Sequence, residues 1–182
     1  MNQDRLYHIS ENGSIKTFYP RPSPSVFEAI KRDVVFAVSG KLLHNYLFPR
    51  DCPRVTYYTT PRTSEADKKK FMGDISAKFI ITVETKWVPV ILQTILYCYE
   101  FPAENFVLLD ECAGYYISYQ LIEPLSVTRI ENPLEELLSR NDIELLTLTS
   151  LHPLADAVAK SSLNFSLIRM RNAIKREDEI YR

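Results

Sequence analysis

Hydrophobic residues recur along the chain in short segments rich in β-branched and aromatic side chains. These segments predict strands at residues 5–10, 33–39, 54–60, 77–84, 105–109, 114–122, 125–131 and 143–149. Turn-forming residues at 11–14 and a proline-containing loop at 18–25 separate the first two. The short connections among the three strands between residues 105 and 131 favour antiparallel pairing.

Other segments carry the signals of helices. We expect helices at 41–48, from Pro89 to about residue 99, at 133–140, at 150–162 and in the tail from residue 164 to 182. The helix beginning at Pro89 is apolar on most sides and is therefore expected to be buried. Residues 63–74 fit a solvated loop or a short helix. The mixed order of elements predicts one α+β domain over residues 1–182, with a mostly antiparallel sheet and flanking helices.

Composition narrows the classes of partner. The 182 residues include 46% hydrophobic residues, enough for one sizeable core. A net charge of -1 gives no general attraction to nucleic acid or anionic lipid, so neither partner is expected. The basic residues between 169 and 176 precede the acidic run 177–179, which indicates charge pairing on a solvated helix. With no apolar run of export or membrane-spanning length, the expected location is the cytoplasm.

Several common kinds of site are disfavoured. The four glycines, at 13, 40, 73 and 114, cannot form a Rossmann fingerprint or a P-loop. Three widely spaced cysteines indicate no disulfide framework, and three histidines without ligand spacing indicate no metal site. We therefore expect no tightly bound cofactor.

Residues His8 and Ser10 form the first candidate site. Positions two apart on a strand share a face, so the imidazole and the hydroxyl would point at one volume. The alternative is a core histidine that is hydrogen-bonded to a backbone carbonyl.

The second candidate is the loop 48–54, in which Pro49 and Pro53 restrict the backbone around Arg50 and Arg54. Two guanidiniums held in this way can bind a phosphate or carboxylate, and Arg21 could extend the same rim. The alternative is an internal ion pair with a carboxylate such as Asp51.

Residues 110–118 are the third candidate, because Asp110 and Glu111 stand at a strand junction beside Tyr115 and Tyr116. Glu123 stands at the next junction. A carboxylate there could stabilise positive charge in a reaction, although turns ordinarily collect acids and strands ordinarily collect tyrosines.

Four segments taken in order carry a resemblance to a known fold. They read L-Y-H-I-S, V-V-F-A-V-S with a following helix, A-K-F-I-I-T-V-E, and G-Y-Y-I-S-Y-Q-L-I-E-P-L-S-V. Together they resemble the ADP-ribosyltransferase fold, in particular its small rifampin-modifying branch with a histidine in the first strand. The whole chain is also similar to a bacterial protein family with no established activity.

The resemblance implies NAD as a substrate and cleavage of its nicotinamide–ribose bond through an oxocarbenium-like transition state. In that case His8 orients the ribose and Tyr46 or Tyr116 packs against nicotinamide. Ser39 or Tyr46 stands at the second motif, and Glu111, Gln120 or Glu123 stands at the third. Arg21, Arg50 or Arg54 holds the pyrophosphate, and Ser10 faces the same volume as His8.

Two further functions remain open at this point. A binding module would use the same pocket for a nucleotide or another phosphorylated ligand without turnover. An interaction domain would use its tyrosine-rich strand (Tyr115, Tyr116 and Tyr119) for a partner or for a homo-oligomer.

Overall fold

The computed structural model of the chain describes residues 5–23 and 27–176. Their contacts divide the chain into two compact units, neither of them continuous in sequence. Unit 1 comprises Met1–Leu47 and Thr94–Pro133, and unit 2 comprises Phe48–Gln93 and Leu134–Arg182. The single domain stays a prediction. The end of the proline-containing loop, at 24–25, and the acidic run 177–179 lie outside the described residues.

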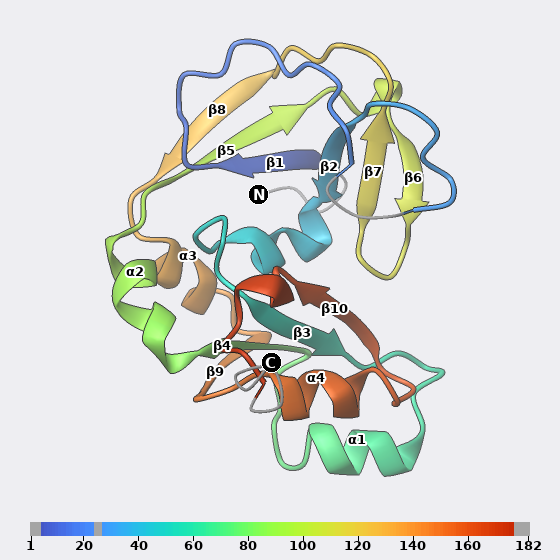
Figure 1. The fold of residues 1–182 in the computed structure, drawn as a ribbon, viewed down its shortest axis with the longest axis vertical. Helices are drawn as coiled ribbons and strands as arrows, with labels where there is room; N and C mark the ends of the chain where they lie inside the picture. The colour runs from blue at the N-terminus through green and yellow to red at the C-terminus, as the bar shows by residue number, and fades with distance from the viewer. Residues whose placement is uncertain (1–4, 24–26, 177–182) are drawn as a thin grey trace. The chain divides into compact units, whose positions relative to one another are not determined.

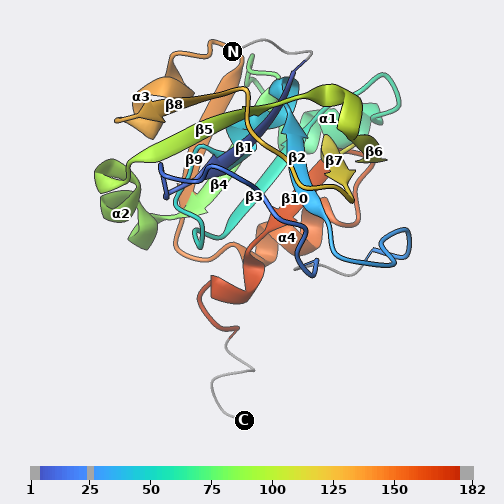
Figure 2. The ribbon, with the colours of Figure 1, turned by 90° about the horizontal axis from the view of Figure 1, so that it is seen from above.

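Unit 1 is built on a six-stranded sheet in the order β6-β7-β2-β1-β5-β8, and every neighbouring pair is antiparallel. Figure 2 shows β8, β5, β1, β2 and β7 following one another across this sheet. Its elements are β1 (Leu6–Ser10), β2 (Val35–Ser39), the 3-10 helix η1 (Gly40–Tyr46), β5 (Leu96–Phe101), η3 (Ala103–Asn105), β6 (Val107–Asp110), β7 (Tyr115–Ser118) and β8 (Ser126–Ile130).

One face of this sheet carries a compact apolar core. Strand alternation places Leu6 of β1, Ala37 of β2 and Phe101 of β5 on that face, because residues two apart point the same way. Phe18 and Ile122 close over them from two loops and exchange backbone hydrogen bonds of 2.8 and 3.0 Å. This face therefore fixes the loop that follows β1.

Unit 2 is built on a four-stranded sheet in the order β10-β3-β4-β9, in which β4 and β9 are parallel and the other pairs are antiparallel. Its elements are β3 (Arg54–Tyr58), α1 (Glu65–Phe71), β4 (Phe79–Glu84), η2 (Thr85–Trp87), α2 (Val88–Gln93), α3 (Pro133–Leu138), β9 (Ile143–Leu148), α4 (His152–Val158), β10 (Asn164–Ile168) and η4 (Met170–Asn172).

The helices α1 and α4 cover one face of this second sheet (Figure 1). Phe71 of α1 and Val158 of α4 share a core cluster with Val55, Tyr57 and Ile80 of the strands. Helix α1 begins at Ser64, whose hydroxyl accepts the Asp67 N–H at 3.2 Å, so an ordinary N-cap starts the helix. Packing of apolar helix faces on the sheet holds the unit together.

The α+β class with mostly antiparallel sheets is confirmed, but two expected helices are wrong. The helix from Pro89 ends at Gln93, and Leu96–Phe101 is instead the strand β5 between β1 and β8. Only Ile91 of α2 is buried, so the expected buried helix is also wrong. Segment 164–176 forms β10 and the short η4 in place of a helix. In both cases backbone pairing outweighs local propensity, because β5 forms ladders with β1 and β8 and β10 forms one with β3.

Two smaller expectations also change. Strands β6 and β7 pair as an antiparallel hairpin, as expected, but β8 pairs with β5 and not with β7. The helix expected to start at Ser150 begins at His152 without a side-chain cap. Over residues 5–23 and 27–176, no helix has the length and apolarity needed to cross a membrane.

Candidate functional site

His8 lies where β1 separates from β2. The ladder between these strands pairs Leu6 with Ser39 and Tyr7 with Val38, whereas β1 stays paired with β5 as far as Ser10. Beyond the ladder the His8 Nδ1 lies 3.1 Å from the carbonyl oxygen of Phe36 in β2. A carbonyl oxygen only accepts, so this hydrogen bond places the ring proton on Nδ1 and leaves Nε2 of a neutral ring as an acceptor. This is also the bond expected of a structural histidine.

Aromatic rings surround the His8 imidazole on the core face. The ring centroids of Phe18 and Phe101 lie 5.0 and 6.0 Å from that of His8. Tyr99 lies opposite His8 on β5, and its hydroxyl donates to the Asn12 carbonyl at 2.8 Å and accepts the Ile15 N–H at 3.1 Å. The loop that follows β1 is therefore anchored over the core face, and the half-buried His8 ring lies among these aromatic rings.

Tyr46 lies on the opposite face of the sheet from His8. Its hydroxyl donates to the hydroxyl of Tyr115, and Tyr115 contacts Phe36 with a centroid distance of 6.2 Å. On β7, Tyr116 pairs with Ala37, which lies on the His8 face of the sheet. The preceding residue, Tyr115, pairs with Val38 and therefore lies on the opposite face. Of the two tyrosines considered for nicotinamide, Tyr116 therefore shares the face of His8 and Tyr46 does not.

The other polar candidates of unit 1, which are Ser10, Ser39 and Arg21, form hydrogen bonds with nearby backbone groups. The Ser10 hydroxyl accepts the Asn12 N–H at 3.1 Å in the turn after β1. Ser39 ends β2, and its N–H donates to the Gly114 carbonyl at 2.9 Å. Arg21 exchanges two backbone hydrogen bonds with Val34, and its side chain is exposed. These contacts place Arg21 beside the start of β2, whereas Ser39 is the last residue of that strand.

The three candidates for the late polar position are all exposed. Glu111 lies in the turn between β6 and β7. Glu123 directly follows Ile122, whose backbone pairs with that of Phe18, the ring beside His8. Gln120 donates its N–H to the Ser118 hydroxyl at 3.1 Å after the end of β7. Of the two candidate carboxylates, Glu111 and Glu123, Glu123 is thus the one that backbone pairing brings closer to the surroundings of His8.

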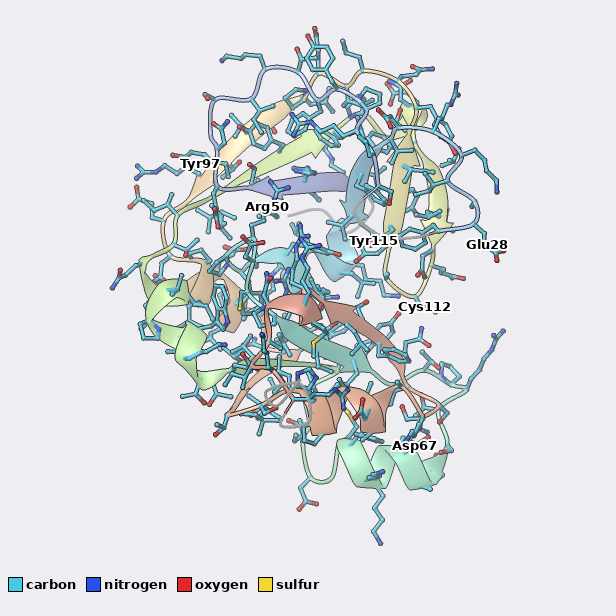
Figure 3. The ribbon with its side chains drawn as sticks, viewed as in Figure 1. Glu28, Arg50, Asp67, Tyr97, Cys112 and Tyr115 are labelled. Carbon is cyan, nitrogen blue, oxygen red and sulfur yellow. The ribbon has the colours of Figure 1, made fainter. Side chains whose placement is uncertain are left out.

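Arg50 and Arg54 belong to unit 2, and they differ from each other. Arg54 is 2% exposed, donates to the Cys52 carbonyl at 2.7 Å and lies over the Phe48 ring at 5.3 Å. Arg50 is exposed in the loop before β3, from which its side chain extends in Figure 3. The buried Arg54 therefore supports the loop, and Arg50 is the residue of this pair that a ligand can reach.

A buried polar group near this loop was not anticipated from the sequence. Glu84, at the end of β4, is 0% exposed, and its Oε1 accepts the Ile174 N–H at 2.8 Å. The Lys86 Nζ lies 3.2 Å from Oε2, which makes an ion pair. The pKa of the Cys52 thiol is raised to about 11, mainly by burial. The positive charge of Arg54 opposes this rise, and the negative charge of Glu84 adds to it. The sequence signal for Glu84 is an acid that closes an otherwise apolar strand and precedes a lysine.

His152 also contacts the backbone of Ile174. Its Nε2 lies 2.7 Å from the Ile174 carbonyl oxygen, so side chains from β4 and α4 bind the N–H and the C=O of Ile174. These contacts attach segment 172–176 to unit 2 without strand pairing. No group of three or more His, Cys, Asp or Glu residues within 5–23 and 27–176 is arranged to hold a metal ion.

A family model matches residues 7–173, which is most of the chain. The chain belongs to the family of unknown function DUF6886. The matched range of DUF6886 contains His8 and all of β1 to β10 except Leu6, and it ends just before Ile174. No curated protein and no solved structure matches the chain.

Proposed function

We propose that unit 1 binds a nucleotide through the face of its sheet that carries His8, with NAD as the first ligand to test. The Nδ1–Phe36 hydrogen bond carries this proposal, because it orients the half-buried imidazole and makes Nε2 an acceptor. A ribose hydroxyl is a suitable donor to such an atom. The resemblance of the L-Y-H-I-S segment to the first strand of ADP-ribosyltransferases supports the same ligand.

The aromatic residues of this face supply a second element of nucleotide recognition. Tyr116 lies on the His8 face and is half-buried, so part of its ring stays accessible to a planar group such as nicotinamide or adenine. Tyr46 would have no part in this contact, because it lies on the opposite face.

The test is a calorimetric titration of the full chain with NAD, compared among three variants. His8→Ala removes the oriented acceptor, and we expect about a threefold to tenfold loss of affinity, the effect of one neutral hydrogen bond. Tyr116→Ala should weaken binding as well, whereas the same truncation at Tyr46 should not. Thermal unfolding of each variant shows whether the protein remains folded.

The outcomes separate a ligand role for His8 from a purely structural one. Loss of thermal stability in His8→Ala with unchanged NAD affinity would assign the residue to the core alone. Absence of saturable NAD binding to the folded wild-type chain at millimolar concentration would reject the proposal outright.

ADP-ribosyl transfer is the second candidate, and the position of Glu123 favours it. The Phe18–Ile122 pair brings the residue before Glu123 against the ring that contacts His8. A carboxylate there would stabilise the oxocarbenium-like transition state. Nicotinamide release that is lost in Glu123→Gln and retained in Glu111→Gln would support transfer, and equal loss in both variants would contradict this assignment.

A further inference from the structure

Arginine residues gather in unit 2 where the loop before β3 meets the segment after β10. The Arg169 Nε donates to the Arg50 carbonyl at 3.2 Å, and the Asn172 Nδ2 donates to the Asp51 carbonyl at 2.8 Å. Arg171 lies between these two anchoring residues. Two hydrogen bonds therefore hold the two segments together and bring Arg50, Arg169 and Arg171 to one region of the surface.

The neighbouring arginines show which guanidiniums the fold already uses. Arg54 is buried against Cys52 and Phe48, and Arg176 makes a two-pronged ion pair with Asp156 at 2.7 and 2.8 Å. By contrast, Arg169 and Arg171 form no ion pair with any residue in the described part of the chain. No carboxylate within residues 5–23 and 27–176 neutralises their positive charge.

The carboxylate that follows Arg50 in the sequence does not change this picture. Asp51 is exposed, and within the described ranges it makes no ion pair with Arg50, Arg169 or Arg171. Arg169 is half-buried, and its Nε is held by the loop, so part of the entropy cost of fixing its side chain has already been met in the folded protein. Arg50 and Arg171 are exposed.

We propose that Arg50, Arg169 and Arg171 form a binding site for phosphoryl groups, which shares no residue with the nucleotide site proposed in unit 1. A guanidinium presents a planar fork that matches two oxygens, so several forks from two segments suit a tetrahedral group with three or more oxygens. A carboxylate, with two oxygens, satisfies one fork only. The ligand class is accordingly a small phosphorylated compound, for which pyrophosphate is the simplest probe.

The experiment is a calorimetric titration of the full chain with pyrophosphate at low ionic strength, where screening of exposed charges is weak. Arg171→Gln is the most informative variant, because the Arg171 side chain makes no hydrogen bond within the described residues and its loss should not disturb the fold. We expect Arg171→Gln to weaken pyrophosphate binding about tenfold or more, the effect of losing a charge-assisted hydrogen bond. Arg169→Gln should have a similar effect.

Arg62→Gln is the matched control, because Arg62 is an exposed arginine of the same unit in the turn before α1. It should leave pyrophosphate affinity within about twofold of wild type, since exposed charges far from a ligand are screened. His8→Ala should also leave it unchanged, so failure of the unit 1 proposal and failure of this one can be told apart.

Two results would overturn the site. One is the absence of saturable pyrophosphate binding to the folded wild-type chain. The other is an equal loss in Arg62→Gln and Arg171→Gln, which would mean that the net charge of the unit attracts the anion without a defined site. Binding of a single-stranded oligonucleotide that both variants weaken equally would lead to the same conclusion.

Discussion

The two units treat the polar side chains on their sheets in different ways. In unit 1, His8 is half-buried, has one nitrogen on a backbone carbonyl and is bordered by aromatic rings. In unit 2, Glu84 and Arg54 are fully buried and hold backbone groups of segment 172–176 and of the loop before β3. Burial together with backbone hydrogen bonds marks a structural polar residue, whereas partial exposure beside aromatic rings marks a candidate for ligand binding.

The largest expected effect contrasts one cysteine from each unit. Cys112 is exposed in the turn between β6 and β7 (Figure 3), whereas Cys52 is buried with a pKa of about 11. At pH 8 only about one Cys52 thiol in a thousand is ionised, so a maleimide should label Cys112 at least about a hundredfold faster. Peptide mass spectrometry after timed labelling measures both rates. Equal rates would show that the loop before β3 opens readily and would break the contrast.

The next effect concerns the buried carboxylate of unit 2. Glu84→Ala leaves the Ile174 N–H without its acceptor and Lys86 without its partner, and we expect a loss of about 2–3 kcal/mol in the free energy of unfolding. Glu144→Ala, on the exposed side of β9, should cost less than about 0.5 kcal/mol. Urea denaturation gives both values. Similar losses would mean that Glu84 is not a structural anchor.

Two glycines with positive φ, one in each unit, differ in the space around them. Gly114 has φ +65, and an added Cβ would lie 2.6 Å from the Ser39 hydroxyl oxygen and 3.0 Å from a Leu42 methyl carbon. Gly73 has φ +51 with open space around it. Replacement by alanine should cost about 1 kcal/mol at Gly73, from backbone strain alone, and about 2 kcal/mol at Gly114, where packing adds to it. Thermal unfolding should rank them in this order, and the reverse order would contradict the packing around Gly114.

The smallest effect is the pH dependence of a surface pair in unit 2. The hydrogen bond from Arg176 lowers the pKa of the Asp156 carboxyl below its ordinary value. A carboxyl group with a lowered pKa stabilises the fold above the unfolded pKa and loses this contribution as the pH falls through the folded one. Asp156→Asn should therefore lower the melting temperature slightly at pH 7 and not at pH 2. Both side chains are partly exposed, so solvent screening keeps the difference small. A difference that persisted at pH 2 would assign it to another cause.

The sequence predicted the fold class and most strands because alternation and β-branched residues mark them directly. It misjudged Leu96–Phe101, where an apolar run fits a buried helix or a central strand equally well, and the partners β1 and β8 decide between them. The parallel pairing of β4 with β9 was also beyond reach, because it depends on contacts between segments far apart in sequence.

The candidate site was predictable only in part. Local spacing correctly placed His8 and Ser10 on one strand. No local pattern shows that Tyr46 and Tyr116 lie on opposite faces, because that depends on the pairing of β7 with β2. Nor could the sequence show that Arg54 points inward while Arg50 is exposed, since burial is a property of the folded chain.

The attachment of Glu84 to Ile174 has a consequence for the order in which the chain can fold during its synthesis. All strands of unit 1 have been made once Ile130 has been added, so that sheet can be completed early. The carboxylate of Glu84 has to wait for Ile174, and β3 has to wait for β10. Until then the growing chain holds a charged group at the end of an apolar strand without its backbone partner. Unit 2 is therefore the part of a nascent chain that would most depend on protection from aggregation.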